Sequence, residues 1–460
     1  MKFGGMSGIF RLVFLILFWC SVAMAAPPAQ NGKTLDLAAC VARALEANPK
    51  IEQANQQVIQ SEWKLKSARL ARTPKMELFN LMGAVNNATE GNGEPAITGD
   101  TTDGIGFFNK LDVDISIPLY TFGRITRGIE AAKEGVAAQQ AARSDAASDL
   151  VLDVHELYYG LIMGRQVLEE TTEIQKNFTT ARDIAEERLE KADPSVAEVD
   201  VLKLRVGLAG ATKGLQRVER EVQVAKEALR RTLALGDREE FDVADRRLNP
   251  VEFKLQPLEH YLQQAEAGNP DMKRLKAGLA AQEAEYLAER AKYYPTILAV
   301  GGLNYAVAPG RPNLDNPFLK DDFHSSSFGG ALAVKWDLNF FQTNAEVNQK
   351  RAQYLKVKSL FQEGKDGLML QVKDRYYKLK EKEENLDSSQ EARKAGRGIL
   401  LLSLTNFKFG IGTGKDVFEG LSVYARTANE YYEAVFNFNM AVAELKAAVG
   451  NLYAGETTVR

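Results

Sequence analysis

The sequence predicts a mainly helical protein with a small β part, in which long helical hairpins follow short β-hairpins. One observation is an internal repeat: Asn48-Pro49 and Asn269-Pro270 each open a charged helical run, which stops at Pro74 and Pro295 at the same spacing. A β-like segment begins after each run, and one of these segments alternates strictly between apolar and polar residues. A long stretch without proline follows each segment. Two similar halves suggest an extended symmetric device rather than an enzyme with one pocket.

The N-terminus has the composition of a secretory leader. Lys2 and Arg11 come before an apolar run that extends from Leu12 to Trp19, and the small residues Ala23-Met24-Ala25 follow. This order of charged, apolar and small residues predicts a signal peptide over residues 1–25.

The two cysteines have different expected roles. Cys20 follows Phe18-Trp19, whereas a lipid-modified cysteine needs small residues before it, so lipidation of Cys20 is the minor alternative. Once the leader is removed only Cys40 remains, and no disulfide can form within the chain. Cys40 lies on an amphipathic segment, which favours burial as a small hydrophobic residue.

Beyond the leader, no apolar run is long enough for a transmembrane helix. The sequence therefore predicts either a soluble periplasmic protein or an outer-membrane protein that spans the bilayer with strands. The net charge of −3 is close to neutral and gives no reason to expect a nucleic-acid partner.

A first structural repeat is expected over residues 26–236. It begins with helices near 36–47 and 49–72, and a β-hairpin over 74–120 follows. Within this hairpin, the Gly-, Asn- and Thr-rich segment 86–104 is expected to be a loop.

The second strand of this hairpin has the clearest pattern in the chain. Its apolar residues alternate with polar ones: Leu111, Val113, Ile115, Ile117 and Leu119 against Lys110, Asp112, Asp114 and Ser116. In a soluble sandwich the apolar face would meet a core. In a membrane barrel it would meet lipid, and Lys110, Asp112 and Asp114 would face a wet lumen.

A long helical hairpin completes the first repeat. Residues 125–190 contain almost nothing that breaks a helix, and about 65 residues make a helix of roughly 100 Å. The chain turns back at 192–195, and Gly236 ends the returning helix.

An irregular charged segment over 237–256 separates the halves, and a second structural repeat over 257–460 follows. Its β-hairpin is expected over 295–338, with strands at 295–308 and 326–338. A long helix then reaches Phe409, glycines make the turn, and the last helix carries a heptad stripe from Val417 to Leu452.

Four strands per chain cannot form a closed barrel, and open edges are not tolerated in lipid. Two chains would give eight strands, whose interior side chains nearly fill the barrel, whereas three would give twelve and leave room for a lumen. The charged helices would project from the membrane and pack side by side. The expected assembly is thus a trimeric α-barrel joined to a twelve-stranded outer-membrane β-barrel.

Two motifs and the repeat carry a family resemblance. Residues 35–49 read Leu-Asp-Leu-x-x-Cys-Val-x-x-Ala-Leu-x-x-Asn-Pro, and residues 117–124 read Ile-Pro-Leu-Tyr-Thr-Phe-Gly-Arg. With the leader and the tandem repeat, these motifs resemble the outer membrane efflux protein (TolC-like) family over nearly the whole mature chain. The resemblance implies a homotrimer in the outer membrane of a Gram-negative bacterium, projecting into the periplasm.

The resemblance also implies a function and partners. The channel would give passive exit to substrates that an inner-membrane transporter and a periplasmic adaptor protein deliver, with outer-membrane lipid around its barrel. The alternative is a periplasmic coiled-coil scaffold or pump adaptor without a barrel. A channel would stay with outer membranes after osmotic release, whereas a scaffold would appear in the periplasmic fraction.

Three acids follow the hairpin turns and are candidates for a periplasmic entrance: Glu198, Asp416 and Glu419. In a threefold assembly each would form a ring of carboxylates, which favours cations. Acids in the first turn of a helix also stabilise its dipole, and this interpretation remains open beside the first.

Four residues are candidates for the entrance turns: Ala192, Phe407, Gly410 and Gly412. Where the family often places a tyrosine and an arginine that hold the entrance closed, this chain has Phe407 and Gly412. Gly410 matches a family glycine at the adaptor-facing tip, and its counterpart in the first half is Ala192. A helix C-cap is the competing role for Gly410.

No catalytic or cofactor-binding pattern is evident. His155, His260 and His324 lie far apart and have no ligand-like spacing, and no nucleophile, phosphate-loop or dinucleotide motif occurs. The sequence predicts a protein that is not an enzyme and needs no cofactor or metal.

Overall fold

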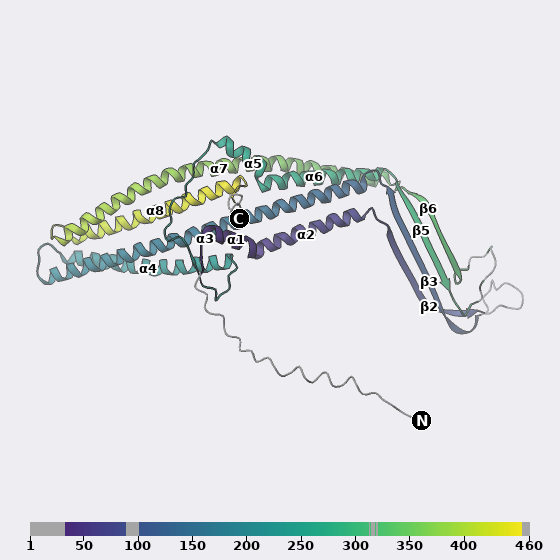
Figure 1. Cartoon of the computed structure of the whole chain (residues 1–460), viewed down its shortest axis with the longest axis horizontal. Coiled ribbons are helices and arrows are strands. Elements are labelled where there is room, and N and C mark those ends of the chain that lie inside the picture. Colours follow the sequence, from purple (N-terminus) through teal and green to yellow (C-terminus); the bar gives the residue numbers. More distant parts are fainter. Residues whose placement is uncertain (1–32, 89–100, 312, 314–317, 319–320, 453–460) are drawn as a thin grey trace, which may run out of the picture.

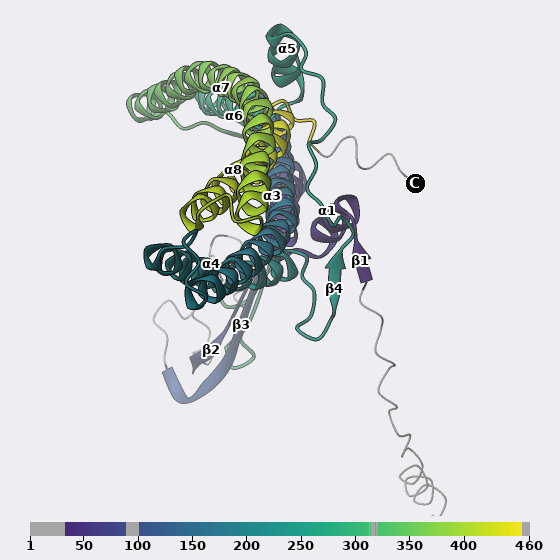
Figure 2. The ribbon, with the colours of Figure 1, turned by 90° about the vertical axis from the view of Figure 1, so that its left-hand side faces the viewer.

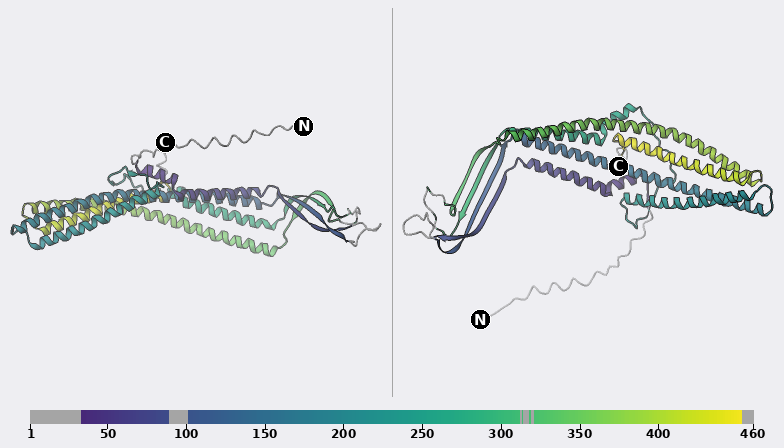
Figure 3. Two further views of the ribbon diagram at one scale, coloured as in Figure 1. Left: turned by 90° about the horizontal axis from the view of Figure 1, so that it is seen from below. Right: turned by 180° about the vertical axis from the view of Figure 1, so that it is seen from behind.

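The computed structural model describes residues 33–88, 101–311, 313, 318 and 321–452. The predicted signal peptide and Cys20 lie outside these residues. Long helices run along the major axis, and a β-sheet extends beyond one end of them (Figure 1). Two further directions show the same separation of sheet and helices (Figure 3). The prediction of a mainly helical chain with a small β part is therefore confirmed.

The helices are α1 (Leu37–Ala47), α2 (Pro49–Leu70), α3 (Arg124–Glu190), α4 (Glu198–Thr232), α5 (Leu258–Gly268), α6 (Pro270–Arg290), the short 3-10 helix η1 (Ala291–Tyr293), α7 (Phe340–Lys408) and α8 (Gly414–Ala448). The strands are β1 (Lys33–Leu35), β2 (Lys75–Ala88), β3 (Thr101–Tyr120), β4 (Phe241–Val243), β5 (Thr296–Val307) and β6 (Ser325–Lys335). The predicted uninterrupted helix over 125–190 corresponds to α3.

The four long strands form one antiparallel sheet in the order β2-β3-β5-β6, so that pairing between β3 and β5 joins the two predicted hairpins. The expected loop over 86–104 is too long. Pairing persists as far as Ala88 and Thr101, because the two strands continue their ladder beyond the Gly- and Asn-rich boundary. The expected strand over 326–338 is also too long: β6 ends at Lys335, where the chain leaves the sheet to begin α7.

Two buried asparagines join helices end to end: Asn48 joins the end of α4 to the start of α2, and Asn269 joins the end of α8 to the start of α6. Asn48 caps the start of α2 by accepting from the backbone N–H of Lys50 (2.9 Å), and its Nδ2 donates to the carbonyl of Thr232, the last residue of α4 (2.8 Å). In the second half, Asn269 accepts from Met272 N–H (3.1 Å) and donates to the carbonyl of Ala448, the last residue of α8 (2.8 Å). Each asparagine thus satisfies orphan backbone groups of two helices at once.

The second of these junctions is the tighter one. Gly450 has a φ of +78°, and a Cβ atom there would lie 2.6 Å from the carbonyl oxygen of Gly268. Glycine is therefore required for both conformation and space. The equivalent position after α4 is Ala234, which takes a φ of +51°.

A small group of elements packs beside the long helices at mid-length. Strands β1 and β4 form a parallel pair, and α1 lies next to them, on one side of the long helices (Figure 2). Their apolar side chains join a core with α3 and α8 that includes Cys40, Val154 and Tyr158. Cys40 is fully buried, as predicted, and burial raises the pKa of its thiol to about 12.

Asn48→Ala is expected to destabilise the protein by about 1–3 kcal/mol, because it removes an N-cap and leaves the partly buried carbonyl of Thr232 without a donor. Asn269→Ala should have a similar effect. Thermal or urea unfolding of the purified protein would measure it. Asn385, exposed on α7, provides the control. Equal transitions for Asn48→Ala and Asn385→Ala would contradict the junction role.

Candidate functional surfaces

The sheet has one uncovered apolar face. Residues that pair directly across an antiparallel sheet share a face, and the registers Met76↔Ile115, Leu78↔Val113 and Leu303↔Phe328 place apolar side chains together. Large members of this face are well exposed, as the values of 91 % for Phe328 and 67 % for Leu78 illustrate. A soluble monomer rarely exposes such a continuous apolar surface.

The opposite face carries charged residues, together with the apolar Phe79 and Leu81, which pair with Asp112 and Lys110. Lys110 forms an ion pair with Asp112 (3.5 Å), and Asn304 on β5 donates to Asp112. Ser325 on β6 donates to Asn304 Oδ1 (2.6 Å). Asp114 lies on this face too, in register with Gly302. Lys110, Asp112 and Asp114 therefore lie together, on the side away from the apolar surface.

Within the described residues, both edges of this sheet are unpaired, since β2 and β6 each have one strand neighbour. The helical layer also has exposed apolar residues near its borders. Val206 on α4 and Leu402 on α7 are 67 % and 66 % exposed. Open strand edges and apolar helix faces are both surfaces that another chain can cover.

Asp416 caps its own helix at the hairpin tip. Its carboxylate accepts from the backbone N–H (2.9 Å) and the hydroxyl (2.8 Å) of Thr413, which in turn caps the start of α8. These bonds, chiefly from the Thr413 backbone, lower the pKa of Asp416. Glu419 lies one turn further, is exposed, and pairs with Lys415 at 3.7 Å. Both acids are near the tip, but only Glu419 is free of the capping arrangement.

Asp200, rather than Glu198, holds the equivalent position in the first hairpin. Glu198 is the exposed first residue of α4, whereas Asp200 occupies the third helical position, as Asp416 does in α8. Asp200 is 7 % exposed and accepts from the backbone N–H of Ala197 (3.3 Å) and of Lys415 (3.2 Å). It thus links the two hairpin tips. The shared Asp-Val pair at 200–201 and 416–417 is the sequence signal that could have identified it.

Arg188 links the same tips from the other side. Arg188 lies in the last turn of α3. Its guanidinium donates to the carbonyls of Phe407 (2.8 Å) and Lys408 (2.9 Å), the last two residues of α7. Its guanidinium also lies 5.3 Å from the centroid of the buried Phe407 ring. A cation therefore meets a helix C-terminus, while Asp200 meets a helix N-terminus, and both contacts agree with the helix dipoles.

The predicted turn residues lie around these contacts. Gly410 and Ala192 both have positive φ, +74° and +52°, and each follows the C-cap residue of its helix, α7 or α3. Both residues therefore end their helices in the left-handed conformation, which is the helix C-cap role proposed as the alternative for Gly410. A Cβ atom at Gly412 would lie 3.1 Å from the Cβ atom of Asn406, so the turn leaves little room for a side chain at this position.

A buried polar network connects three helices above the tips. Glu170 on α3 accepts from the hydroxyls of Tyr424 and Tyr432 on α8 (2.8 Å each) and from Arg393 on α7 (3.1 Å). Burial, followed by the bond to Glu170, raises the pKa values of Tyr424, to about 12, and of Tyr432. The sequence did not indicate this network, because its members are widely separated along the chain.

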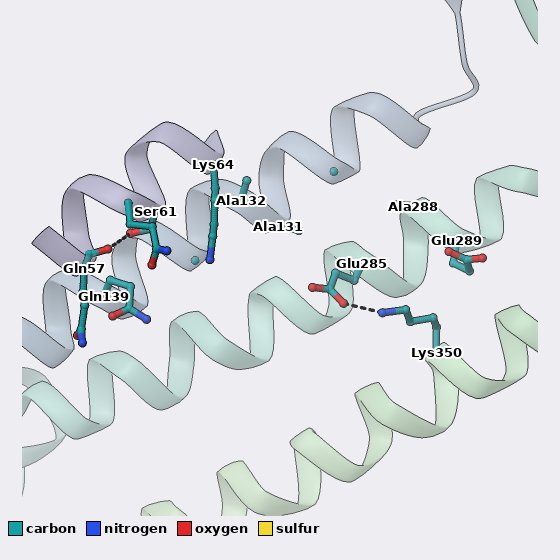
Figure 4. A pocket seen from close by; sticks show the side chains of 13 residues that line it. Gln57, Ser61, Lys64, Ala131, Ala132, Gln139, Glu285, Ala288, Glu289 and Lys350 are labelled. Carbon is teal, nitrogen blue, oxygen red and sulfur yellow. Dashed lines mark hydrogen bonds and ion pairs between the residues drawn. The ribbon is translucent and has the colours of Figure 1, made fainter. Parts of the chain in front are cut away.

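A hollow of about 780 Å³ lies between α2, α3, α6 and α7 (Figure 4). Small residues of α3 such as Ala131 and Ala132 form part of its lining, and the ion pair Glu285–Lys350 (2.9 Å) borders it. The described residues contain no group of His, Cys, Asp and Glu side chains suited to a metal ion. Across the same residues, no helix is long and apolar enough to cross a membrane.

The sequence profile of the outer membrane efflux proteins matches residues 40–235 and 261–451. The chain belongs to this family.

Solved structures have the same fold. The outer-membrane channel OprN is 16 % identical and superposes with a TM-score of 0.75, covering 90 % of each chain. The CmeC outer-membrane channel of Campylobacter jejuni is 16 % identical, with a TM-score of 0.72 over 90 % of this chain and 86 % of its own. The MtrE channel of Neisseria gonorrhoeae in its open state is 15 % identical, with a TM-score of 0.72 over 90 % and 89 %. No curated protein sequence matches the chain.

Arg188→Gln is expected to loosen the tip, because it removes two charge-assisted bonds to the end of α7. Backbone amides of residues 405–417 should exchange hydrogen about tenfold faster, as a local loss of about 1.4 kcal/mol would give. Hydrogen exchange with mass spectrometry measures this. Arg182, which pairs with its neighbour Asp183 on the same helix, is the control. Unchanged exchange in Arg188→Gln would contradict the link.

Proposed function

We propose that this protein is an outer-membrane channel that assembles as a homotrimer and gives passive exit to substrates. The observation that carries the proposal is the four-stranded sheet, with an uncovered apolar face, a polar opposite face and two open edges. Lipid would cover the apolar face, and pairing of β6 with β2 of the next copy would close the edges. Three copies give twelve strands and a lumen lined by Lys110, Asp112 and Asp114.

The long helices would continue the channel beyond the barrel. Helix α3 has 67 residues, which corresponds to about 100 Å. The apolar borders near Val206 and Leu402 would pack against each other in adjacent copies. The hairpin tips would then form the periplasmic entrance, where a periplasmic adaptor and an inner-membrane transporter deliver the substrate. Membership of the efflux family supports this arrangement.

The proposal is tested by two substitutions at neighbouring positions of β3. Ile115→Arg places a cation on the lipid face and should cost about 2–4 kcal/mol near mid-bilayer, so that the yield of trimer in outer membranes falls. Asp114→Arg on the polar face should assemble normally and change conductance. Native mass spectrometry and planar-bilayer recording measure the two effects.

A monomer released into the periplasmic fraction by osmotic shock, with its sheet intact, would contradict the channel and would favour a periplasmic scaffold. Equal assembly and equal conductance of the two variants would show that the faces are assigned wrongly.

The entrance acids generate a second test. Three copies each of Asp416 and Glu419 would concentrate carboxylates at the tip and attract cations. The double change Asp416→Asn and Glu419→Gln should shift the reversal potential in a KCl gradient toward anions and weaken block by multivalent cations several-fold. Asparagine keeps an acceptor for Thr413, so α8 should still form. Glu391→Gln, far from the tip, is the control. Unchanged selectivity would mean that the acids only stabilise the helix end.

A further inference from the structure

A cavity of about 670 Å³ lies where the sheet meets the long helices, and we call it the junction pocket. Lys75 and Ser116, which pair across β2 and β3, line it from the polar face of the sheet. Thr296 and Lys335 pair across β5 and β6 and line it from the other side. Strand alternation puts all four on the face that carries Asp112 and Asn304. The pocket is therefore on the side away from the uncovered apolar surface.

Cationic side chains outnumber acidic ones in the lining of this pocket. Lys75, Arg124 and Lys335 come from β2, the start of α3 and the end of β6, and within the described residues none of them has an acidic partner at ion-pair distance. Three unpaired cations that line one cavity repel one another, which favours an anion between them.

The acids of the pocket are mostly engaged elsewhere. Glu346 accepts from Gln342 (3.1 Å) and Lys292 (3.1 Å), and these bonds lower its pKa. Lys292 also pairs with Glu289, so this fourth cation is neutralised. Asp337 accepts from the backbone N–H of Asn339 (3.1 Å). Three cations without an acidic partner, Lys75, Arg124 and Lys335, thus share the cavity with the carboxylate of Asp337, which is not bonded to the group around Glu346.

We propose that the junction pocket binds an anionic group, carboxylate or phosphate, of a small solute that passes along the polar face. The inference rests on the proposed function, in which that face lines the lumen. Arg124 can bind either group with two parallel hydrogen bonds, while Lys75 and Lys335 supply point charges. The first turns of α3 and α7 also border the cavity and add to its positive potential.

The position of the pocket decides the source of the anion. A phospholipid headgroup would have to approach from the apolar face, which is on the other side of the sheet. A dissolved anion reaches the polar face through the lumen. The volume exceeds that of a single phosphate group, so a small organic anion also fits. In a trimer the three pockets would form a cationic zone near the base of the barrel, far from the acids at the hairpin tips.

Direct binding of inorganic pyrophosphate tests the proposal. Calorimetric titration of the protein in a non-ionic detergent at low ionic strength should give binding that weakens as salt is added. The triple variant Lys75→Gln, Arg124→Gln, Lys335→Gln should bind at least tenfold more weakly. Lys335→Gln alone, at the exposed end of β6, should weaken binding about threefold and covers the case in which the triple variant fails to assemble.

The matched control removes three exposed cations elsewhere: Lys176→Gln, Lys213→Gln and Lys254→Gln. This control should bind like the parent. The proposal is overturned if the parent does not bind pyrophosphate, if the pocket variants bind as tightly as the parent, or if the control loses binding equally. Competition by phosphatidylglycerol in mixed micelles would assign the pocket to a lipid headgroup and would also overturn it.

Bilayer recording separates this proposal from the proposed function. Pyrophosphate should reduce the current of the parent and have a several-fold weaker effect on the pocket variants. Specific binding in a protein that forms no conducting trimer would refute the channel and leave the pocket intact. A conducting trimer whose pocket variants bind pyrophosphate like the parent would refute the pocket and leave the channel intact.

Discussion

The end-to-end junctions made by Asn48 and Asn269 are the constraint on which the architecture depends. A helix end normally needs capping or water for its orphan backbone groups. Here one buried amide caps the helix above and donates to the last carbonyl of the helix below. Helices α4 and α2 therefore continue one another beside the unbroken α3, and α8 and α6 do the same beside α7. Each such end-to-end pair acts as one helical column. Every element beyond the junction, including the sheet and the tips, takes its position from these columns.

The two halves repeat this plan but differ at their tips. Each half contributes a hairpin with an aspartate at the third position of its returning helix. In the second half Asp416 serves its own cap, whereas in the first half Asp200 also reaches across to Lys415. In the contacts made by Asp200 and Arg188, the first hairpin therefore supplies the side chains and the second supplies backbone groups. The asymmetry is a property of a few side chains on an otherwise repeated backbone.

The sequence predicted the fold class, the course of α3 and the alternation in β3, since periodicity and helix-breaking residues report local structure directly. Strand ends were less accurate. Pairing extended β2 to Ala88, and the start of α7 shortened β6. The Asp-Val pair marks Asp200 as the counterpart of Asp416, but the contacts of Arg188, Asp200 and Glu170 with other helices could not be predicted, because each depends on a partner more than 200 residues away. A charged residue on a helix has the same local pattern whether it is solvated or buried in such a contact.

The burial of Cys40 has a consequence for redox chemistry. Thiol–disulfide exchange requires a thiolate that can reach its partner. Cys40 has no exposed surface, and with a pKa of about 12 it holds almost no thiolate at neutral pH. Two copies of the chain that meet would otherwise risk cross-linking through Cys40 before their interfaces had formed. The core around α1 removes that risk for Cys40 in each folded subunit.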